Sequence, residues 1–331
     1  MNKSYIAIIG PALAKANNGN WQTARRWQQF LRADHRVACM TAWQAEVDAA
    51  PALMVALHAR RSAPSIAAYT AAFPQRPLVL VLTGTDLYRD IAVDAAAQRS
   101  LALATRIVVL QPAGVDALPP AVRGKTQVIY QSAATLTPHV PPPNARRFTV
   151  IMIGHLRAEK DPQTYMQAAA LVTAPRVRML HLGAALDPAL GQLALQTQAT
   201  VSRYAWHGAL AQPQTRQCLK RSALMVISSR MDGGANVIIE AVTSGVPVLA
   251  SDIDGNRGML GPDYAGYFPV GDSAALARMV DRAAVDADFH ALLRRQCAQR
   301  APLFAPARER AAVVELVDNC LSNLLHYTGH Q

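Results

Sequence analysis

Residues 224–251 read L-M-V-I-S-S-R-M-D-G-G-A-N-V-I-I-E-A-V-T-S-G-V-P-V-L-A-S. The apolar runs at 224–229 and 246–251 have the composition of buried strands. Between them lie a short loop and a helical pattern over about 236–244, which stops at Gly245. This order predicts a βαβ unit with two parallel strands, from which doubly wound α/β folds are built.

Two acids, Asp232 and Glu240, stand eight positions apart in this otherwise apolar segment. Asp232 precedes Gly233-Gly234, whose backbone has no side chain to keep a ligand away. Taken alone, Asp232 is explained as a first-turn acid favoured by the helix dipole, and Glu240 as a solvent-facing helix acid. Together with the glycines they predict a shared polar site. We expect the buried face of the helix to consist of Val237, Ile238, Ala241 and Val242.

The same alternation of apolar runs and helical patterns covers the whole chain. Near-continuous apolar runs are typical of parallel strands that are covered on both faces. The predicted strands are 4–10, 36–41, 52–58, 77–83, 106–110 and 126–131, then 148–153, 178–183, 224–229 and 246–251. Helical patterns lie between them, such as the one over 20–32, whose shared face is Ala24, Trp27, Gln28 and Leu31. The pattern predicts two doubly wound, Rossmann-like α/β domains.

A proline-rich stretch divides the chain. Three consecutive prolines cannot continue a helix or a central strand, so residues 139–146 are the predicted linker. We predict an N-terminal domain over 1–138 and a C-terminal domain over 147–305, facing each other across a cleft that is the expected ligand site. An amphipathic helix over about 306–331 is expected to cross back to the N-terminal domain.

Composition limits the classes of function. The chain has 331 residues, of which 51% are hydrophobic and 17% charged, as in globular proteins. Its net charge of +11 comes from dispersed residues without a nucleic-acid-binding motif, so small phosphorylated ligands are favoured over nucleic acid. No apolar run is long enough to span a bilayer, and the first residues are a poor signal peptide. Four scattered cysteines favour reduced thiols in a cytoplasmic protein and give little support to zinc.

Polar residues follow the predicted strands of the first domain, where open parallel sheets bind ligands. After the first strand comes a glycine turn and a helix start that could bind an anion or be an ordinary βα turn. The residues concerned are Lys15, Gly19, Asn20, Thr23 and Arg25.

Two further strand ends carry candidate residues. His58, Arg60 and Arg61 follow the third strand and predict either a phosphate site or a solvated helix start. Thr83, Gly84, Thr85 and Asp86 follow the fourth strand. They could recognise a hydroxyl or ammonium group, and capping of the next helix is the alternative for Asp86 and Asp90.

In the second domain, the strand at 148–153 leads into G-H-L-R-A-E-K-D-P, residues 154–162. Asp161 and Pro162 predict a helix start, with Asp161 as the N-cap. Arg157 and Lys160 stand just before it, although residues near a helix N-terminus are usually acidic. A diphosphate bound by both cations and the helix dipole would account for them.

These motifs resemble the signature of GT-B glycosyltransferases of the family 4 kind, and the resemblance covers essentially the whole chain. By this resemblance, Glu240 would bind the ribose of a nucleotide, Lys160 its diphosphate, and Asp232 with the backbone of Gly233-Gly234 the donor sugar. The other implied donor-site residues are Gly154, His155, His207, Arg230, Ala235 and Asn236. The family usually has Glu at the position of Asp232 and Arg at that of His155, so Arg157 is the expected second cation.

A narrower resemblance is to the selenosugar synthases of selenoneine biosynthesis. It rests on G-N-W-Q-T-A-R-R-W, L-H-A-R-R-S, L-T-G-T-D-L-Y-R-D, G-H-L-R-A-E-K-D-P and D-G-G-A-N-V. It implies transfer of N-acetylglucosamine, or glucose, from a UDP-sugar to selenophosphate, with release of UDP and phosphate. Partner enzymes of the pathway would supply the selenophosphate. No prosthetic group or metal is expected.

The acceptor implied by this resemblance is a small anion. The basic residues after the first and third strands would bind it beside the segment 83–86 of the first domain. His58 and Asp86 would orient the acceptor, since an anionic nucleophile needs no strong base. Three alternatives stay open: a hexosyltransferase with a hydroxyl acceptor, a UDP-sugar 2-epimerase, and a non-catalytic sugar-nucleotide binder.

Overall fold

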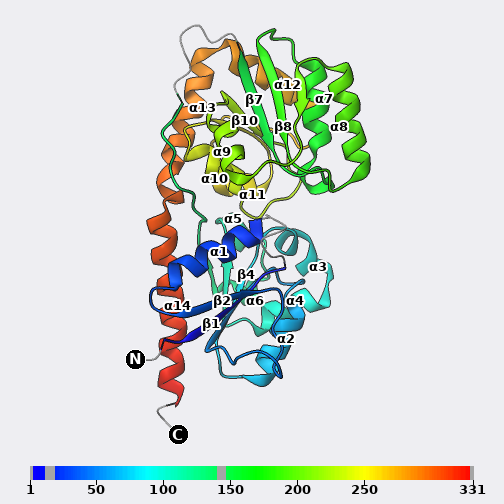
Figure 1. Ribbon diagram of the computed structural model, residues 1–331. Helices are drawn as coiled ribbons and strands as arrows, with labels where there is room; N and C mark the ends of the chain where they lie inside the picture. Colours follow the sequence, from blue (N-terminus) through cyan, green and yellow to red (C-terminus); the bar gives the residue numbers. More distant parts are fainter. Residues whose placement is uncertain (1–2, 12–18, 140–146, 329–331) are drawn as a thin grey trace. The chain divides into compact units, whose positions relative to one another are not determined.

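The structure is a computed structural model that divides the chain into two compact units (Figure 1). The described residues are 3–11, 19–139 and 147–328. The first unit comprises Met1–Gln131 and Pro306–Gln331, and the second unit comprises Ser132–Ala305. All of the predicted linker except His139 lies outside the described residues.

The sheet of the first unit has six parallel strands in the order β2-β1-β3-β4-β5-β6. Their bounds are β1 Tyr5–Ile9, β2 Arg36–Met40, β3 Leu53–Leu57, β4 Leu78–Val81, β5 Arg106–Val109 and β6 Thr126–Val128. The chain runs outward from β1 to β2 and then returns to the other side of β1 at β3. The direction of winding therefore reverses between β1 and β3, which is the position at which such sheets bind ligands.

Helices cover both faces of this sheet (Figure 1). One core cluster includes Tyr69, Leu80 and Leu101, and the other includes Trp27, Val55 and Val317. The helices are α1 Gly19–Leu31, α2 Ala63–Ala72, the π-helical turn η2 Asp86–Asp90, α3 Ile91–Val93, α4 Ala95–Leu103, α5 Ala113–Asp116, α6 Pro120–Arg123 and α14 Pro306–Thr328. Two covered faces explain why these strands are apolar along their whole length.

The helix α14 packs on the first unit, as the expected fold requires. Its buried Glu309 accepts hydrogen bonds from Arg26 Nε at 2.6 Å and Trp27 Nε1 at 2.9 Å, both on α1. Val313 and Val317 of α14 complete the core on that side of the sheet. A buried carboxylate is costly unless it is paired, so this contact fixes α14 against α1.

The sheet of the second unit also has six parallel strands, in the order β12-β11-β10-β7-β8-β9. Their bounds are β7 Phe148–Ile153, β8 Val177–Leu182, β9 Tyr204–Trp206, β10 Leu224–Ile227, β11 Val248–Ser251 and β12 Tyr267–Phe268. The winding reverses between β7 and β10, which gives the strand order of a Rossmann fold. The predicted α/β class with two Rossmann-like halves is confirmed.

The helices of the second unit follow its strands in regular alternation. They are the 3₁₀ turn η3 Ala158–Lys160, α7 Pro162–Leu171, α8 Pro188–Thr200, α9 Gln212–Lys220, α10 Asn236–Val242, α11 Asp254–Leu260, α12 Ser273–Val285, α13 Ala287–Arg300 and the 3₁₀ turn η4 Ala301–Phe304. The segment 132–138, which enters this unit, pairs with it through Ala133 N to Phe304 O and Leu136 N to Thr243 O.

Several details differ from the predictions. The strands β9 and β12 were not predicted, because runs of three and two residues are too short to show a period. The helix α10 buries Ile239 where Val237 was expected, and it ends at Val242. In α1, Thr23 belongs to the buried face and Gln28 is half-buried, donating to Val37 O.

Candidate functional site

The reversal of winding in the second unit brings together the two segments that carry its candidate residues. The turn at 154–161 follows β7, and the loop at 228–235 follows β10. Because β7 and β10 are paired neighbours in a parallel sheet, both segments leave the sheet at the same edge. The adjacency of Lys160 and Asp232 thus follows from strand order, which separates them by 72 positions in sequence but by one strand spacing in the fold.

Alternate residues of the loop after β10 hold the turn after β7. Ser228 Oγ donates to Lys160 O at 3.1 Å and to Asp161 O at 2.8 Å. Arg230 N donates to Glu159 O at 3.0 Å, and its guanidinium lies 3.0 Å from Asp161 Oδ2. These bonds fix the backbone of the turn independently of the Lys160 side chain.

Asp161 differs from the expected N-cap of α7. It occupies the N-cap position before Pro162, but its φ of 44° is left-handed and its side chain makes no capping bond. Its carboxylate instead accepts from Thr164 Oγ1 at 2.8 Å and pairs with Arg230. A non-glycine residue in this conformation is strained, and the loop from β10 holds it there.

The central contact of this edge is an ion pair between Lys160 Nζ and Asp232 Oδ2. The two side chains are 19% and 11% exposed. The backbone of the Asp232 loop is fixed by Gly255 at the start of α11, because a Cβ at Gly255 would lie 1.9 Å from Asp232 O. Gly233, Gly234 and Ala235 are buried in the same loop.

Two further residues of the turn surround this ion pair. His155 Nδ1 accepts from Ala184 N at 3.0 Å. Burial, with smaller effects of Arg157 and Lys160, lowers the pKa of His155 below its usual value, so it is neutral at neutral pH. The half-buried Arg157 has a buried Nε with no hydrogen-bond partner among the described residues. It is therefore a cation that can still accept an anionic ligand.

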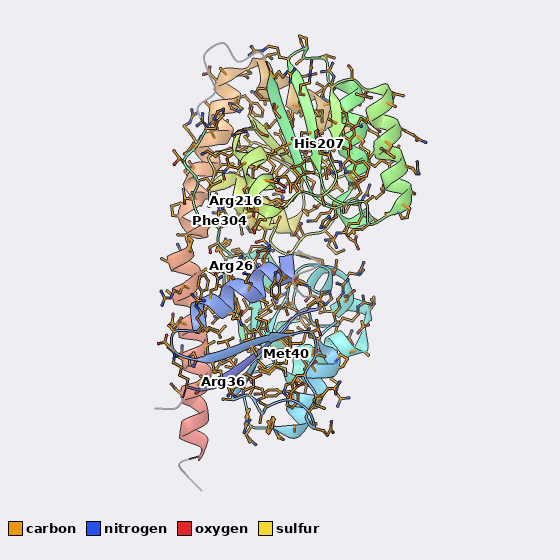
Figure 2. The ribbon with its side chains drawn as sticks, in the orientation of Figure 1. Arg26, Arg36, Met40, His207, Arg216 and Phe304 are labelled. Atoms are coloured by element: carbon orange, nitrogen blue, oxygen red, sulfur yellow. The ribbon has the colours of Figure 1, made fainter. Side chains whose placement is uncertain are left out.

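The remaining donor-site candidates lie on other elements of the second unit. Glu240 and Asn236 are on α10, where both are half-buried, and Glu240 Oε1 accepts from Gln212 Nε2 at 3.4 Å. The exposed His207 follows β9 (Figure 2). Its N donates to His181 O. Gly154 contacts neighbouring segments closely, since a Cβ on Gly183 would lie 1.9 Å from Gly154 O.

In the first unit, the reversal of winding lies between β1 and β3. Gly19 and Asn20 open α1, exposed and half-buried, and Arg25 is exposed on the same helix. The predicted Lys15 lies outside the described residues. Thr23 is buried: its Oγ1 donates to Gly19 O at 2.8 Å and accepts from Gln131 Nε2. Its hydroxyl thus joins the first turn of α1 to the segment that follows β6.

His58 follows β3 with a φ of 76°, and it is buried. Its Nδ1 accepts from Arg61 N at 3.3 Å, which leaves the proton on Nε2, 3.1 Å from Thr85 Oγ1. Burial lowers the pKa of His58; nearby Asp86 and Asp90 oppose this effect and Arg61 adds to it. The neutral ring is therefore a hydrogen-bond donor to Thr85 at neutral pH.

Two buried carboxylates organise the rest of this edge. Asp86 is fully buried, and it accepts from Thr83 N, Gly84 N and Ala59 N at 2.8–3.0 Å. It thus fixes the ends of β3 and β4 rather than capping the next helix. Asp90 is 3.0 Å from Arg60 Nε and 3.0 Å from Arg89 Nε. Arg60 is therefore paired, whereas Arg61 is exposed.

The sequence analysis did not single out three polar residues at these edges, Gln111, Gln131 and Ser228, and it gave Asp161 only a capping role. Gln111 and Gln131 follow β5 and β6 and are buried, and each has an Oε1 without a hydrogen-bond partner among the described residues. Ser228 and Asp161 carry the bonds that join the two segments of the second unit. Gln111 directly follows the predicted strand 106–110, which was an available signal, whereas Gln131 and Ser228 lie inside the predicted strands 126–131 and 224–229.

Neither metal sites nor membrane spans stand out in the part of the chain that the structure describes. No group of three or more His, Cys, Asp or Glu residues there is placed to hold a metal ion. Within the same residues, no helix has both the length and the apolar character needed to cross a bilayer.

Comparison with known proteins places this fold among glycosyltransferases. Residues 147–286 match the sequence profile of a family described as glycosyl transferases group 1. No significant match was found among curated protein sequences.

The chain resembles the crystal structure of Anabaena HepE in complex with UDP and glucose, with a TM-score of 0.76 and 18% identity over 96% of this chain and 100% of that one. Sucrose-phosphate synthase from Thermosynechococcus elongatus gives a TM-score of 0.77 at 16% identity, covering 97% and 100%. The lipopolysaccharide outer core galactosyltransferase WaaB gives 0.67 at 13% identity, covering 98% and 99%. The two Rossmann-like units match the GT-B fold of these glycosyltransferases.

Proposed function

We propose that the protein is a UDP-sugar-dependent glycosyltransferase, and more narrowly one that joins the C1 of N-acetylglucosamine, or of glucose, to the selenium of selenophosphate. The observation that carries the proposal is the arrangement after β7 and β10, where Lys160 pairs with Asp232 and the turn that holds Lys160 also carries Arg157. The profile match over residues 147–286 and the likeness to a structure with bound UDP and glucose support a donor site in this unit.

The donor is bound by groups of the second unit. Lys160 and Arg157 supply two cations for the diphosphate at the start of α7. Gly233 and Gly234 bring backbone close to the sugar, and Glu240 on α10 accepts the ribose hydroxyls. The remaining donor-site residues are Gly154, His155, His207, Arg230, Ala235 and Asn236.

Bond cleavage at C1 requires stabilisation of the leaving UDP. The C1–O bond breaks with its electron pair on UDP, while C1 gains oxocarbenium character. Lys160 and Arg157 stabilise the growing charge, which is the kind of preorganised electrostatic term that lowers such barriers most. The selenium of selenophosphate forms the new bond to C1, and water then takes the phosphoryl group from selenium, releasing phosphate.

The acceptor is bound by the first unit. Arg61, Arg25 and the start of α1 at Gly19 and Asn20 supply positive potential for a small anion, together with Arg60 and Lys15. His58 and Thr85 form a neutral hydrogen-bonding pair beside Thr83 and Gly84. Asp86 is a positioning residue here, because its carboxylate is committed to three backbone N–H groups. No general base is needed for an acceptor that is already anionic.

Mass spectrometry of three parallel reactions tests the proposal. The protein is incubated with UDP-N-acetylglucosamine and selenophosphate, with an alcohol acceptor, or with neither. The expected result is a selenosugar with equimolar UDP and phosphate in the first reaction only. UDP release that is unaffected by selenophosphate contradicts the narrow proposal. A 2-epimerised sugar nucleotide would indicate the epimerase, and intact donor in all three reactions would indicate a non-catalytic binder.

A hydroxyl-bearing acceptor is the second candidate. The buried Oε1 atoms of Gln111 and Gln131 lack hydrogen-bond donors among the described residues, and an acceptor hydroxyl could supply one. Sucrose-phosphate synthase and the galactosyltransferase are among the similar structures, which supports the same candidate. Product formation from the alcohol, and not from selenophosphate, would select it.

A further inference from the structure

The cation assigned to the donor diphosphate is paired with a carboxylate of the protein itself. Lys160 Nζ is bonded to Asp232 Oδ2, and both side chains are mostly buried. An ammonium group held this way cannot bind a diphosphate with full strength until the carboxylate gives it up. Asp232 therefore has a role in addition to binding the donor sugar, because it pairs with the cation of the diphosphate site.

We propose that Asp232 and the diphosphate compete for Lys160. The carboxylate pairs with Lys160 in the structure, and an arriving diphosphate displaces it. The displacement frees the Asp232 carboxylate to accept a hydroxyl of the donor sugar. This inference rests on the proposed donor site and adds an exchange of partners to it.

The surrounding contacts permit this exchange without movement of the turn. The backbone around Lys160 is held by Ser228, Arg230 and the Arg230–Asp161 pair, none of which uses Lys160 Nζ. The ammonium can thus change partner by rotation of the lysine side chain, which has several accessible rotamers.

The Asp232 carboxylate cannot move with the Lys160 ammonium when the lysine side chain rotates. Gly255 packs directly under Asp232 O and fixes the backbone of the loop, and the aspartate side chain is too short to extend. Arg157, whose buried Nε has no hydrogen-bond partner within the described part of the chain, adds a second cation for the diphosphate. A ligand with at least two negative charges between two cations is favoured over one carboxylate on one cation.

Calorimetric titration with UDP tests the competition in a double-mutant cycle. The proteins are wild type, Asp232→Asn, Lys160→Met and the double variant. Asp232→Asn is expected to bind UDP about 3- to 10-fold more tightly, because it releases the ammonium. Lys160→Met is expected to bind it at least 10-fold more weakly. In the Lys160→Met background, Asp232→Asn should change UDP affinity by less than about twofold.

Controls separate competition from a general charge effect and from misfolding. If Asp232→Asn tightens UDP binding equally in both backgrounds, removal of a negative charge explains the gain and the inference is overturned. Unchanged or weaker UDP binding by Asp232→Asn overturns it as well. Asp232→Glu keeps the charge and is expected to lack the gain in UDP affinity; a gain as large as that of Asp232→Asn overturns the inference. Circular dichroism and the thermal midpoint establish that each variant is folded.

The experiment distinguishes this inference from the proposed function. A folded wild-type protein that binds neither UDP nor a UDP-sugar contradicts the proposed function, and the inference with it. A wild-type protein that binds UDP and transfers the sugar, with no gain in the Asp232→Asn variant, contradicts the inference alone.

Discussion

Asp86 of the first unit and Asp232 of the second both stand at the carboxyl edge of a parallel sheet, but they bind different kinds of partner. Asp86 is fully buried and accepts from three backbone N–H groups. Asp232 is partly exposed and pairs with the side chain of Lys160. Backbone donors cannot leave without unfolding the loop, whereas a lysine can rotate away. The Asp86 carboxylate thus has a structural role, whereas the Asp232 carboxylate can exchange partners.

The two edges also share a feature. Among the described residues, His58 and Asp161 are the non-glycine residues with positive φ, at 76° and 44°. Each stands where the winding of its sheet reverses, and each is held by side-chain bonds from a neighbouring segment. Strain of this kind persists only where the surroundings compensate for it. The backbone is therefore fixed at the carboxyl edges of both sheets. The two edges differ in the partner of the aspartate, which is a set of backbone N–H groups for Asp86 and the Lys160 side chain for Asp232.

Removal of the Asp86 carboxylate is expected to have the largest effect on the stability of the first unit. Asp86→Ala leaves three N–H groups without their acceptor and should lower the free energy of unfolding of the first unit by about 3–5 kcal/mol. Hydrogen exchange at Val55 and Leu80, in the neighbouring strands, measures this loss. Asp94→Ala is the matched control, since Asp94 caps α4 through one bond to Ala97 N and should cost about 1 kcal/mol. Equal losses of unfolding free energy in Asp86→Ala and Asp94→Ala would show that Asp86 contributes no more to the fold than a single helix cap.

Removal of the Lys160 ammonium should act on turnover and leave stability almost unchanged. Lys160→Ala is expected to lower kcat about 10²- to 10³-fold, because the leaving diphosphate loses one of its cations. Steady-state assays of UDP release measure the effect, with the thermal midpoint as the control for folding. A variant with full activity would show that Lys160 has no role in the leaving-group site.

The stability of the second unit is expected to depend on pH because of the buried His181 in β8. Burial lowers the pKa of His181 to about 4, whereas an unfolded histidine titrates near 6.5. Only the unfolded state takes up this proton as the pH falls from about 6.5 to 4, so the second unit should lose up to about 3 kcal/mol of stability in that window. Hydrogen exchange of the amides of β8 measures the opening free energy.

The comparison variant for this pH dependence is His181→Gln. It cannot take up the proton, so its opening free energy should vary less between pH 6.5 and 4 than that of wild type. Lowered pKa values of His58 and His155 produce a change of the same sign, which this variant retains. An unaltered pH profile in His181→Gln would contradict the assignment.

The smallest effect is expected at Arg230. Its side chain is 58% exposed, so the pair with Asp161 should contribute less than about 1 kcal/mol. Arg230→Ala is expected to alter UDP affinity less than about threefold, because Ser228 still holds the turn. A loss of UDP binding as large as that in the Lys160 variants would show that the turn depends on Arg230.

Local sequence patterns predicted the candidate residues at the carboxyl edge of the second unit's sheet better than those at the corresponding edge of the first unit's sheet. Lys160, Arg157 and Asp232 stand out because cations before a helix and an acid with two glycines after a strand are both unusual. Their contact depends on β7 and β10 being neighbours, and strand order is a property of the whole sheet that short patterns do not contain. Asp86 was recognised as a polar residue after a strand, but its three backbone donors come from two loops that only the fold brings together.

Thr23 shows a second limit. Its position one helical turn before Trp27 puts it on the buried face of α1, but apolar periodicity does not count a threonine. Its hydroxyl donates locally to Gly19 O, but the donor that it accepts from is Gln131, more than a hundred positions away. Predictions from spacing fail where a buried polar residue depends on a distant partner.

The contact between α1 and α14 has a consequence for synthesis on the ribosome. The core of the first unit includes Val313, Leu316 and Val317, and Glu309 supplies the acceptor for Arg26 and Trp27. The first 131 residues therefore leave the exit tunnel without the part of this core that α14 supplies, and that part stays uncovered until the whole second unit has been translated. The unit that begins the chain is the last to finish folding, so any factor that protects nascent apolar surface acts on it longest.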